Sequence, residues 1–383
     1  MTPKDSQCVL YVAVVLQFGV LAGSAQTGTY LFTGSETNIT LNPGTYDITA
    51  YGAKGGSFEP SAANRPGGLG AEMSAEFNFS APTTLVLLVG GSGGTGVYYG
   101  GGGGGGSFIV NGTTALVVAG AGGGGSSSGV GGPGVTTTSG GTFGFGAGTG
   151  GSEGSGGGGT TYPGGGGGGG GGLYGNGGNA AGTGSTGGGG GGFSFFSGGG
   201  GGSSGTYFGG GGGYAGGYGG GGGGGGGYPG AGGGGGYSGG SGGGGGGGSI
   251  IDSSAIMVLA EISGVASPDD SPNGEIIITA VPGPSTLTYQ VINGELVLNW
   301  VQGTLLSAGT VNGTYTPVSG ATSPYTNSMT VAQQYFRVLV GADATLKAGP
   351  GWTVPNQAHA ANTAMKTLFH AVGQWRGVAD RHR

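Results

Sequence analysis

Alternating polar and apolar positions predict short β-strands on both sides of a long glycine-rich tract. Tyr46, Ile48 and Ala50 alternate with polar neighbours, which is the period-two pattern of a strand with two distinct faces. A second strand-like stretch precedes this one, and the turn signal Asn42-Pro43-Gly44 separates the two. Further strands are expected at 71–79, 84–89, 107–110 and 115–119 before the tract, and at 256–262 and 275–279 after it.

Two of these predicted strands carry additional information about pairing. Leu85 to Val89 is apolar at every position, as expected of a strand that is buried on both faces. Asn273-Gly274 lies between the two strands that follow the tract, and this dipeptide is a hairpin-type turn signal. We therefore expect these last two strands to be joined by a tight turn.

The glycine tract is predicted to be an insertion into one β-domain, because strands stand directly before it and after it. Closing a long insertion costs little more free energy than closing a short one. A segment whose two ends are fixed by a shared sheet must also return to its starting point. This geometry favours side-by-side packing of the inserted glycine segments.

Runs of glycine punctuated by aromatic residues fill residues 90–249. A left-handed helix with three residues per turn rises about 3.1 Å per residue and makes no internal hydrogen bonds. Only a chain without Cβ atoms lets neighbouring helices approach on all sides and pair with its backbone groups. The runs therefore predict an ordered bundle of polyglycine helices. A flexible linker is the alternative, since glycine- and serine-rich sequence is ordinarily a flexible spacer.

Aromatic residues between the runs are expected at the ends of the glycine rods, where they cap the bundle or pack on the β-domain. Tyr and Phe supply apolar contact area with few torsions to order, so they are also the candidate ligand contacts. The candidate contact residues are Tyr162, Tyr174, Tyr207, Phe208, Tyr214, Tyr218, Tyr228 and Tyr237.

Composition and charge restrict the class of partner. Glycine supplies 115 of 383 residues, charged residues make up only 6%, and the formal net charge is -6. No Lys or Arg occurs between Pro66 and Phe336, although acids are scattered through this stretch. Binding to nucleic acid or to anionic lipid needs cations, so neither partner is expected.

The first 25 residues have the pattern of a secretory signal, with one Lys, an apolar run from Cys8 to about Leu21, and small residues before Gln26. We expect cleavage near Ser24 or Ala25 and a secreted or cell-surface protein without a membrane span in the mature chain. The alternative is an uncleaved signal anchor, for which the apolar run is short. Cys8 is the only cysteine, so the mature chain is expected to have no disulfide and no cysteine metal site.

Three sequence pieces resemble the glycine-rich domain of the anaplastic lymphoma kinase and leukocyte tyrosine kinase receptors and of its bacterial secreted relatives. They are GTYDITAYGAKGG, GGLGAEMSAEFNFSAPTTLVLLVGGSGG followed by GGGGGGSFIV and ALVVAGAGGGG, and GGGGGGGSIIDSSAIMVLAEISGV with GEIIIT. The resemblance covers about Tyr30 to Val281. It implies a jelly-roll β-sandwich with an inserted polyglycine bundle that serves as an extracellular binding module. The kinase activity of the receptors does not carry over, because the sequence has no VAIK-like, HRD-type or DFG motif.

The remainder of the chain divides into a short β-module and a tail. Alternation in Leu296, Leu298 and Trp300 and a closing strand at Tyr335–Val340 are similar to a fibronectin type III-like module. We therefore expect a signal peptide at 1–25, a glycine-rich domain at 26–283 with its insertion at about 120–249, a β-module at 284–340 and a tail at 341–383. The tail is either a short amphipathic helix or sequence read in a wrong frame, and both interpretations stay open.

Catalytic chemistry is not expected. His359, His370 and His382 are the only histidines, and all lie in the tail. Glu72 and Glu76 lie four apart on one face of a predicted strand, where we expect them to be solvated. The acidic stretch 269–275 departs from the spacing of a calcium loop and is interpreted as a tight turn. No metal and no cofactor are therefore predicted.

Together these patterns predict a mainly β, secreted, non-enzymatic surface protein. Its glycine-rich domain is expected to bind an extracellular protein or glycan. The alternative is a coat or matrix component that associates with itself through its glycine and tyrosine repeats.

Overall fold

The structure of the chain is a computed structural model. It describes residues 27–59, 65–96, 100–127, 129–144, 146–161, 166–181, 188–203, 231–282, 286–328 and 334–339. These residues form strands β1 to β16 and one short 3₁₀ helix, η1 (Phe195–Ser197), without any α-helix among them. The protein is therefore mainly β, as the alternating pattern predicts. The predicted signal peptide and the tail at 341–383 lie outside the described residues.

Two compact units can be separated. The first comprises residues 1–43, 48–75 and 79–279, and the second comprises residues 44–47, 76–78 and 280–383.

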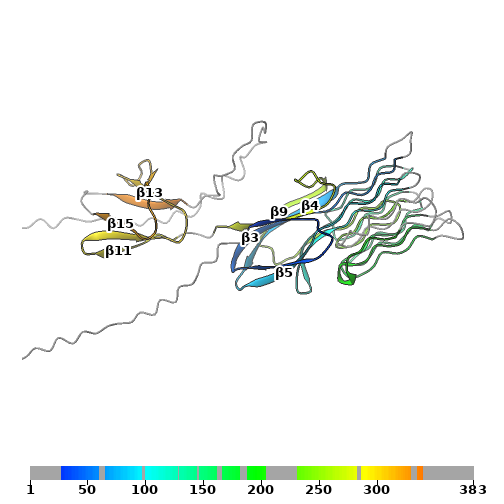
Figure 1. The fold of residues 1–383 in the computed structure, drawn as a ribbon, viewed down its shortest axis with the longest axis horizontal. Helices are drawn as coiled ribbons and strands as arrows, with labels where there is room; N and C mark the ends of the chain where they lie inside the picture. The colour runs from blue at the N-terminus through cyan, green and yellow to red at the C-terminus, as the bar shows by residue number, and fades with distance from the viewer. Residues whose placement is uncertain are drawn as a thin grey trace, which may run out of the picture. The chain divides into compact units, whose positions relative to one another are not determined.

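The first antiparallel sheet has five strands in the order β1-β10-β3-β4-β9. They are β1 (Gly28–Leu31), β10 (Glu275–Val281), β3 (Gly44–Tyr51), β4 (Gly70–Phe79) and β9 (Met257–Val265). The β1 strand pairs with β10 in the register Gly28 to Ile278. The strand β9 stands at one edge of this sheet, next to β4 (Figure 1).

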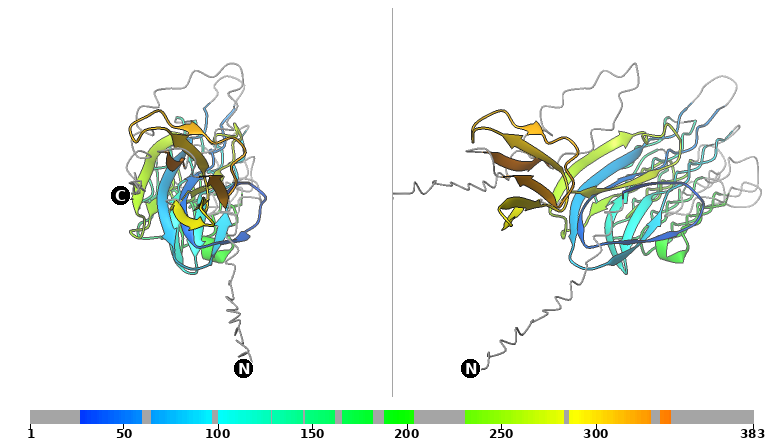
Figure 2. Two further views of the ribbon diagram at one scale, coloured as in Figure 1. Left: turned by 90° about the vertical axis from the view of Figure 1, so that its left-hand side faces the viewer. Right: turned by 60° about the vertical axis from the view of Figure 1, so that its left-hand side comes forward.

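The second antiparallel sheet has five strands in the order β2-β5-β6-β7-β8. They are β2 (Thr37–Leu41), β5 (Thr83–Leu88), β6 (Ser107–Asn111), β7 (Thr114–Ala119) and β8 (Ile250–Ile251). The two five-stranded sheets give this part of the chain a β-sandwich-like character (Figures 1 and 2).

The period-two pattern explains how these strands bury their apolar side chains. Tyr46, Ile48 and Ala50 of β3 are buried, while the residues between them are only half-buried. In β5, Leu85, Leu87 and Leu88 are all buried, so apolar side chains on both faces of the strand are covered. This confirms the prediction of a strand that is buried on two sides.

The predicted tight hairpin at Asn273-Gly274 is wrong. The strands β9 and β10 are not neighbours, because β3 and β4 lie between them in the sheet. The two residues instead bind the segment at 90–92. Asn273 Oδ1 accepts a hydrogen bond from the Ser92 amide at 2.9 Å, and the Gly274 amide donates one to Gly90 O at 2.9 Å. A Cβ at Gly274 would lie 2.3 Å from Tyr51 O, so the position requires glycine for close approach.

Residues 120–249 leave the second sheet at β7 and return to it at β8. These two strands pair antiparallel, with Val117 opposite Ile251 and Val118 opposite Ile250. The ends of the tract are therefore held together by a sheet, as expected, although the strand that closes the tract is β8 and not the predicted strand at 256–262.

We use the name glycine lattice for the glycine-rich segments at 52–56, 67–69, 90–106 and 120–248, so far as they are described. These segments are neither helical nor paired as regular strands, apart from η1 and isolated bridges. They run side by side in Figures 1 and 2 and are joined by backbone hydrogen bonds. Much of their backbone is buried despite the lack of side chains.

The hydrogen bonds of the lattice repeat every three residues. The amides of Gly101 and Gly104 donate to Gly125 O and Gly122 O, at 2.8 and 2.9 Å. The next amides along, those of Gly102 and Gly105, donate instead to Gly94 O and Gly91 O, at 2.9 and 2.8 Å. One segment therefore bonds to different neighbours in different directions.

Segment 120–125 follows the same rule with three neighbours. The amides of Ala121 and Gly124 donate to Gly235 O and Gly232 O, at 2.8 and 2.9 Å. The amides of Gly122 and Gly125 donate to Ala53 O and Gly56 O, both at 2.9 Å, and Gly123 donates to Gly132 O at 2.8 Å. At Gly122, Gly123 and Gly124 an added Cβ would lie 1.9, 2.0 and 2.1 Å from a carbonyl oxygen of a neighbouring segment, so these positions have no room for a side chain.

The second unit contains two three-stranded sheets, ordered β11-β12-β15 and β14-β13-β16. Their strands are β11 (Thr288–Ile292), β12 (Glu295–Asn299), β13 (Thr304–Ala308), β14 (Thr316–Pro317), β15 (Tyr325–Ser328) and β16 (Tyr335–Leu339). The buried side chains of Leu298, Trp300 and Leu305 form its small core. The Trp300 indole Nε1–H donates to Gly303 O at 3.1 Å, so the buried ring keeps a polar partner.

Candidate functional site

Four aromatic rings lead from the buried core to the surface of the glycine lattice. Phe108 of β6 stacks on Phe195 with ring centroids 5.1 Å apart. The Phe195 ring meets Phe196 edge to face at 5.1 Å, and Phe196 stacks on Tyr174 at 5.6 Å. Phe108 and Phe195 are buried, whereas Phe196 is 47% and Tyr174 58% exposed. We call Tyr174 and Phe196 the aromatic pair.

Local backbone geometry fixes Phe196. The Ser194 amide donates to Asn176 Oδ1 at 2.7 Å, and the Phe195 amide donates to Gly172 O at 3.0 Å. Gly198 ends the 3₁₀ turn with φ of 89°, a left-handed conformation that suits glycine. The turn is therefore bonded at both ends, and Phe195 anchors it in the core.

Tyr174 is held from the other side by a glycine. Its amide donates to Gly154 O at 2.9 Å. A Cβ added to Gly154 would lie 2.5 Å from Cδ2 of the Tyr174 ring, so the ring lies directly over this glycine. The residue before it, Glu153, is exposed and has φ of 50°, a region in which a non-glycine residue is strained by roughly 1–2 kcal/mol. Glu153 therefore directly precedes the glycine over which the Tyr174 ring lies.

Tyr237 packs under this surface. It lies against the core cluster that contains Leu88, Phe108, Leu173 and Phe195. Burial raises the pKa of the Tyr237 phenol, and the nearby Tyr174 and Glu153 raise it further. Tyr237 therefore stays neutral at physiological pH and serves mainly as a packing residue.

The structure brings two of the predicted contact residues, Tyr174 and Tyr237, to one site. The other six, Tyr162, Tyr207, Phe208, Tyr214, Tyr218 and Tyr228, lie outside the described residues. Phe196 and Glu153 were not among the predicted contacts. The signal for Phe196 was the Phe-Ser-Phe-Phe stretch between two glycine runs, of which Phe193 and Phe196 are exposed and Phe195 is buried.

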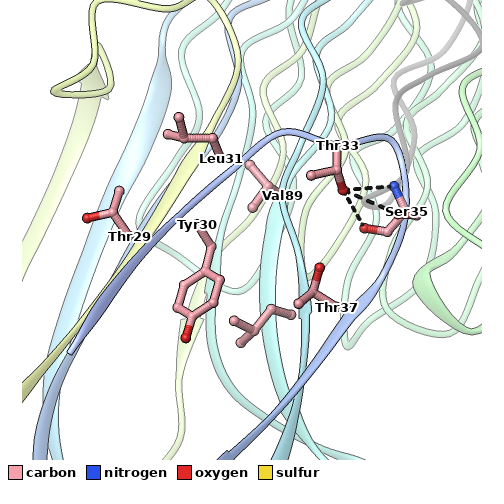
Figure 3. A pocket seen from close by; sticks show the side chains of 8 residues that line it. Thr29, Tyr30, Leu31, Thr33, Ser35, Thr37 and Val89 are labelled. Atoms are coloured by element: carbon pink, nitrogen blue, oxygen red, sulfur yellow. Dashed lines mark hydrogen bonds between the residues drawn. The ribbon is translucent and has the colours of Figure 1, made fainter. Parts of the chain in front are cut away.

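A small pocket of about 230 Å³ lies between β1, β2 and β5 (Figure 3). Its wall combines hydroxyl groups with three apolar side chains: Thr29, Tyr30, Leu31, Thr33, Ser35, Thr37, Leu87 and Val89. Thr33 Oγ1 donates to Ser35 O at 3.2 Å and accepts the Ser35 amide at 3.4 Å, so the loop uses part of this polarity itself. Ligand pockets usually measure about 300–1,000 Å³, so this pocket is smaller than most of them. We therefore consider it a weaker candidate for ligand binding than the aromatic pair.

Polar pairs cross between β3 and β4 on one face of the first sheet. Glu72 accepts a hydrogen bond from Tyr51, Thr49 Oγ1 and Ser74 Oγ lie 2.6 Å apart, and Asp47 lies near Glu76. Burial raises the pKa of the Asp47 carboxyl, and the charge of Glu76 raises it further. Glu72 and Glu76 do share one face, but they are half-buried rather than solvated as expected.

The acidic stretch at 269–275 is a turn that is closed by its own side chains. Asp269 Oδ1 accepts a hydrogen bond from Ser267 Oγ and the amide of Ser271. Glu275 Oε2 accepts the amide of Asp269 at 3.2 Å. Among the described residues, no group of three or more His, Cys, Asp or Glu side chains is placed to hold a metal ion.

Comparison with known proteins adds no relative: no protein-family model matches the chain, and no curated protein matches it significantly. The described part of the chain also contains no helix of the length and apolarity needed to cross a membrane.

Proposed function

We propose that this chain is a secreted, non-enzymatic surface protein whose glycine-rich domain is a binding or adhesion module for an extracellular protein or glycan. The observation that carries the proposal is the aromatic pair: two exposed, mutually stacked rings connected through Phe195 to the buried core. Large apolar rings that are already ordered lose little entropy on binding, which is the property of a binding hot spot.

The glycine lattice supports this proposal as a rigid scaffold. We take it to be a bundle of polyglycine helices inserted into a jelly-roll sandwich. Hydrogen bonds that change neighbour with a period of three favour this interpretation, because such a helix has three residues per turn. The small β-module after it is proposed to be a fibronectin type III-like spacer.

Binding of the purified chain to arrays of immobilised extracellular glycans and matrix proteins tests this function. We expect a specific hit whose affinity falls at least about tenfold in the Tyr174→Ala, Phe196→Ala double variant, because truncating hot-spot rings typically costs more than about 1 kcal/mol. Both side chains are exposed, so the fold should be retained, and circular dichroism checks this.

The matched control is Phe143→Ala, which removes another ring, 44% exposed, elsewhere on the lattice. This variant should bind like the unaltered chain. A chain that binds nothing on the arrays, or a double variant that binds as well as the unaltered chain, would count against the proposal.

A further inference from the structure

The edge strand β9 and the residue before it expose an unusual number of apolar side chains. Ile256, Met257, Val258, Leu259 and Ile262 are each between 42% and 56% exposed, although they lie within seven consecutive residues. Successive residues of a strand point to opposite faces, so Val258 and Ile262 lie on one face and Met257 and Leu259 on the other. Both faces of this edge are therefore apolar and exposed.

Over residues 257–263 the strand lacks the usual features that prevent an edge from pairing, and its left-handed residue, Gly264 with φ of 72°, follows this segment. Natural edge strands are typically protected by Lys, Pro or a very short length. The nine residues of β9, MVLAEISGV, contain no Lys and no Pro, and Glu261 is their only charge. Among the described contacts, only the C-terminal part of β9 is engaged by the lattice, where Ser263 Oγ donates to Gly134 O at 2.6 Å. The outer edge of β9 is last in its sheet.

We propose that β9 pairs antiparallel with β9 of a second copy of this chain. The pairing has its two-fold axis at Ala260, so that the first sheets of the two copies join edge to edge. This interaction goes beyond the ligand-binding function proposed above and uses a different surface.

Self-complementarity selects this partner and this register. With the axis at Ala260, Val258 of each copy lies opposite Ile262 of the other, and the two Ala260 residues face each other. One face of the paired β9 strands then carries only apolar side chains. The Val258–Ile262 pairs on this face are β-branched, and such cross-strand pairs stabilise a sheet. On the other face, Leu259 lies opposite Glu261, which keeps the two carboxylates from direct opposition.

Neighbouring registers are less favourable. An axis at Glu261 places the two carboxylates directly opposite each other, which is destabilising. An axis at Leu259 places Val258 opposite Ala260 and moves Ile262 opposite Ile256, which lies outside the strand. Only the axis at Ala260 joins the two largest β-branched residues of this face.

A pairing of this kind is closed, because each copy uses its one β9 edge and none is left over. It predicts a dimer and not a growing matrix. Two copies also present two aromatic pairs, and two linked sites bind an immobilised ligand more strongly than one through effective concentration.

Light scattering combined with size-exclusion chromatography of the purified full chain tests the pairing. We expect a monomer–dimer equilibrium with no larger species. Val258→Asp should raise the dimer dissociation constant about a hundredfold or more, because the symmetry makes each substitution act twice and each one places a carboxylate opposite the apolar side chain of Ile262. Val130→Asp is the matched control, since Val130 is 48% exposed and lies outside β9, and it should dimerise normally.

Cross-linking tests the register independently of stability. In a Cys8→Ser background, Ala260→Cys should form an intermolecular disulfide under oxidising conditions, because opposite Cβ atoms lie about 4.5–5.5 Å apart and a disulfide spans nearly this distance. Leu259→Cys faces Glu261 and should cross-link at least tenfold more slowly. Near-ultraviolet circular dichroism confirms that each variant is folded.

Three outcomes would overturn the proposal. The first is a monomer at every concentration up to the solubility limit. The second is a dimer that Val258→Asp leaves intact, with no Ala260→Cys cross-link, which would place the interface elsewhere. The third is strong hydrogen-exchange protection of the outer β9 amides in the dilute monomer, which would mean that the chain covers this edge itself.

Discussion

Gly122 shows why single glycines in the lattice cannot be replaced. Its amide donates to Ala53 O, its carbonyl accepts the Gly104 amide, and a Cβ would lie 1.9 Å from Gly68 O. We predict that Gly122→Ala lowers the free energy of unfolding by about 1–2 kcal/mol. Overpacking costs roughly 1–3 kcal/mol, which exceeds the 0.4–1 kcal/mol gained by restricting the unfolded chain. Urea denaturation followed by circular dichroism measures the difference.

Gly129→Ala is the control at the same scale. A Cβ at Gly129 would meet nothing within 4 Å, and its φ is not left-handed. This variant should be unchanged or slightly more stable, because alanine restricts the unfolded chain. Equal loss of stability in both variants would show that contacts with Gly68 do not determine the requirement for glycine at 122.

Asp47 gives a prediction about pH. Its Oδ1 atom is buried without a hydrogen-bond partner, and burial followed by the Glu76 charge raises the pKa of this carboxyl in the folded chain. Between the unfolded and the folded pKa the native state binds more protons, so stability falls as pH rises through that window. Asp47→Asn should therefore raise the thermal midpoint at pH 7.

The gain from Asp47→Asn should shrink as pH falls through the folded pKa and disappear below the ordinary aspartate value of 3.8. Thermal unfolding at several pH values measures this, with Glu36→Gln, an exposed carboxylate, as the control. A gain that is the same at pH 3 and pH 7 would mean that ionisation of Asp47 is not the cause.

At the scale of elements, strands could be predicted where one face is buried and could not be paired from local signals alone. The alternation at Tyr46, Ile48 and Ala50 correctly predicts which face of β3 packs against the core, because all three side chains are buried. The Asn273-Gly274 signal gave a wrong prediction of strand pairing because such a signal describes only the local backbone conformation. The strands that pair with β10 are β1 and β3, which lie far from it in the sequence. Side-chain patterns determine the faces of strands, and the whole sheet determines their order.

The candidate site was predictable only in its residue types. Aromatic residues between glycine runs had to lie at the margins of the lattice, and Tyr174 does so. The pattern could not show that Phe195 turns into the core while Phe196 turns out, because that choice depends on Phe108 and Gly172 from distant segments. The position of Glu153 near Tyr174 depends in the same way on distant segments, because it requires the chain around Gly154 to pack against the Tyr174 ring.

At the scale of the whole molecule, the lattice should behave as one cooperative body with the sheets. In an edge strand only alternate amides are paired, but here the consecutive amides of Ala121, Gly122 and Gly123 donate to three separate segments. Hydrogen exchange should therefore find consecutive amides of 121–125 protected about a thousandfold or more over the exposed turn at 112–113, equivalent to about 4 kcal/mol.

The described parts of 166–172 and 231–248 should open together with β6 and β7, because β7 and β8 hold the two ends of the tract. Free exchange across these glycines alongside protected strands would instead show that the tract is a linker, and the aromatic pair would then lack its rigid support.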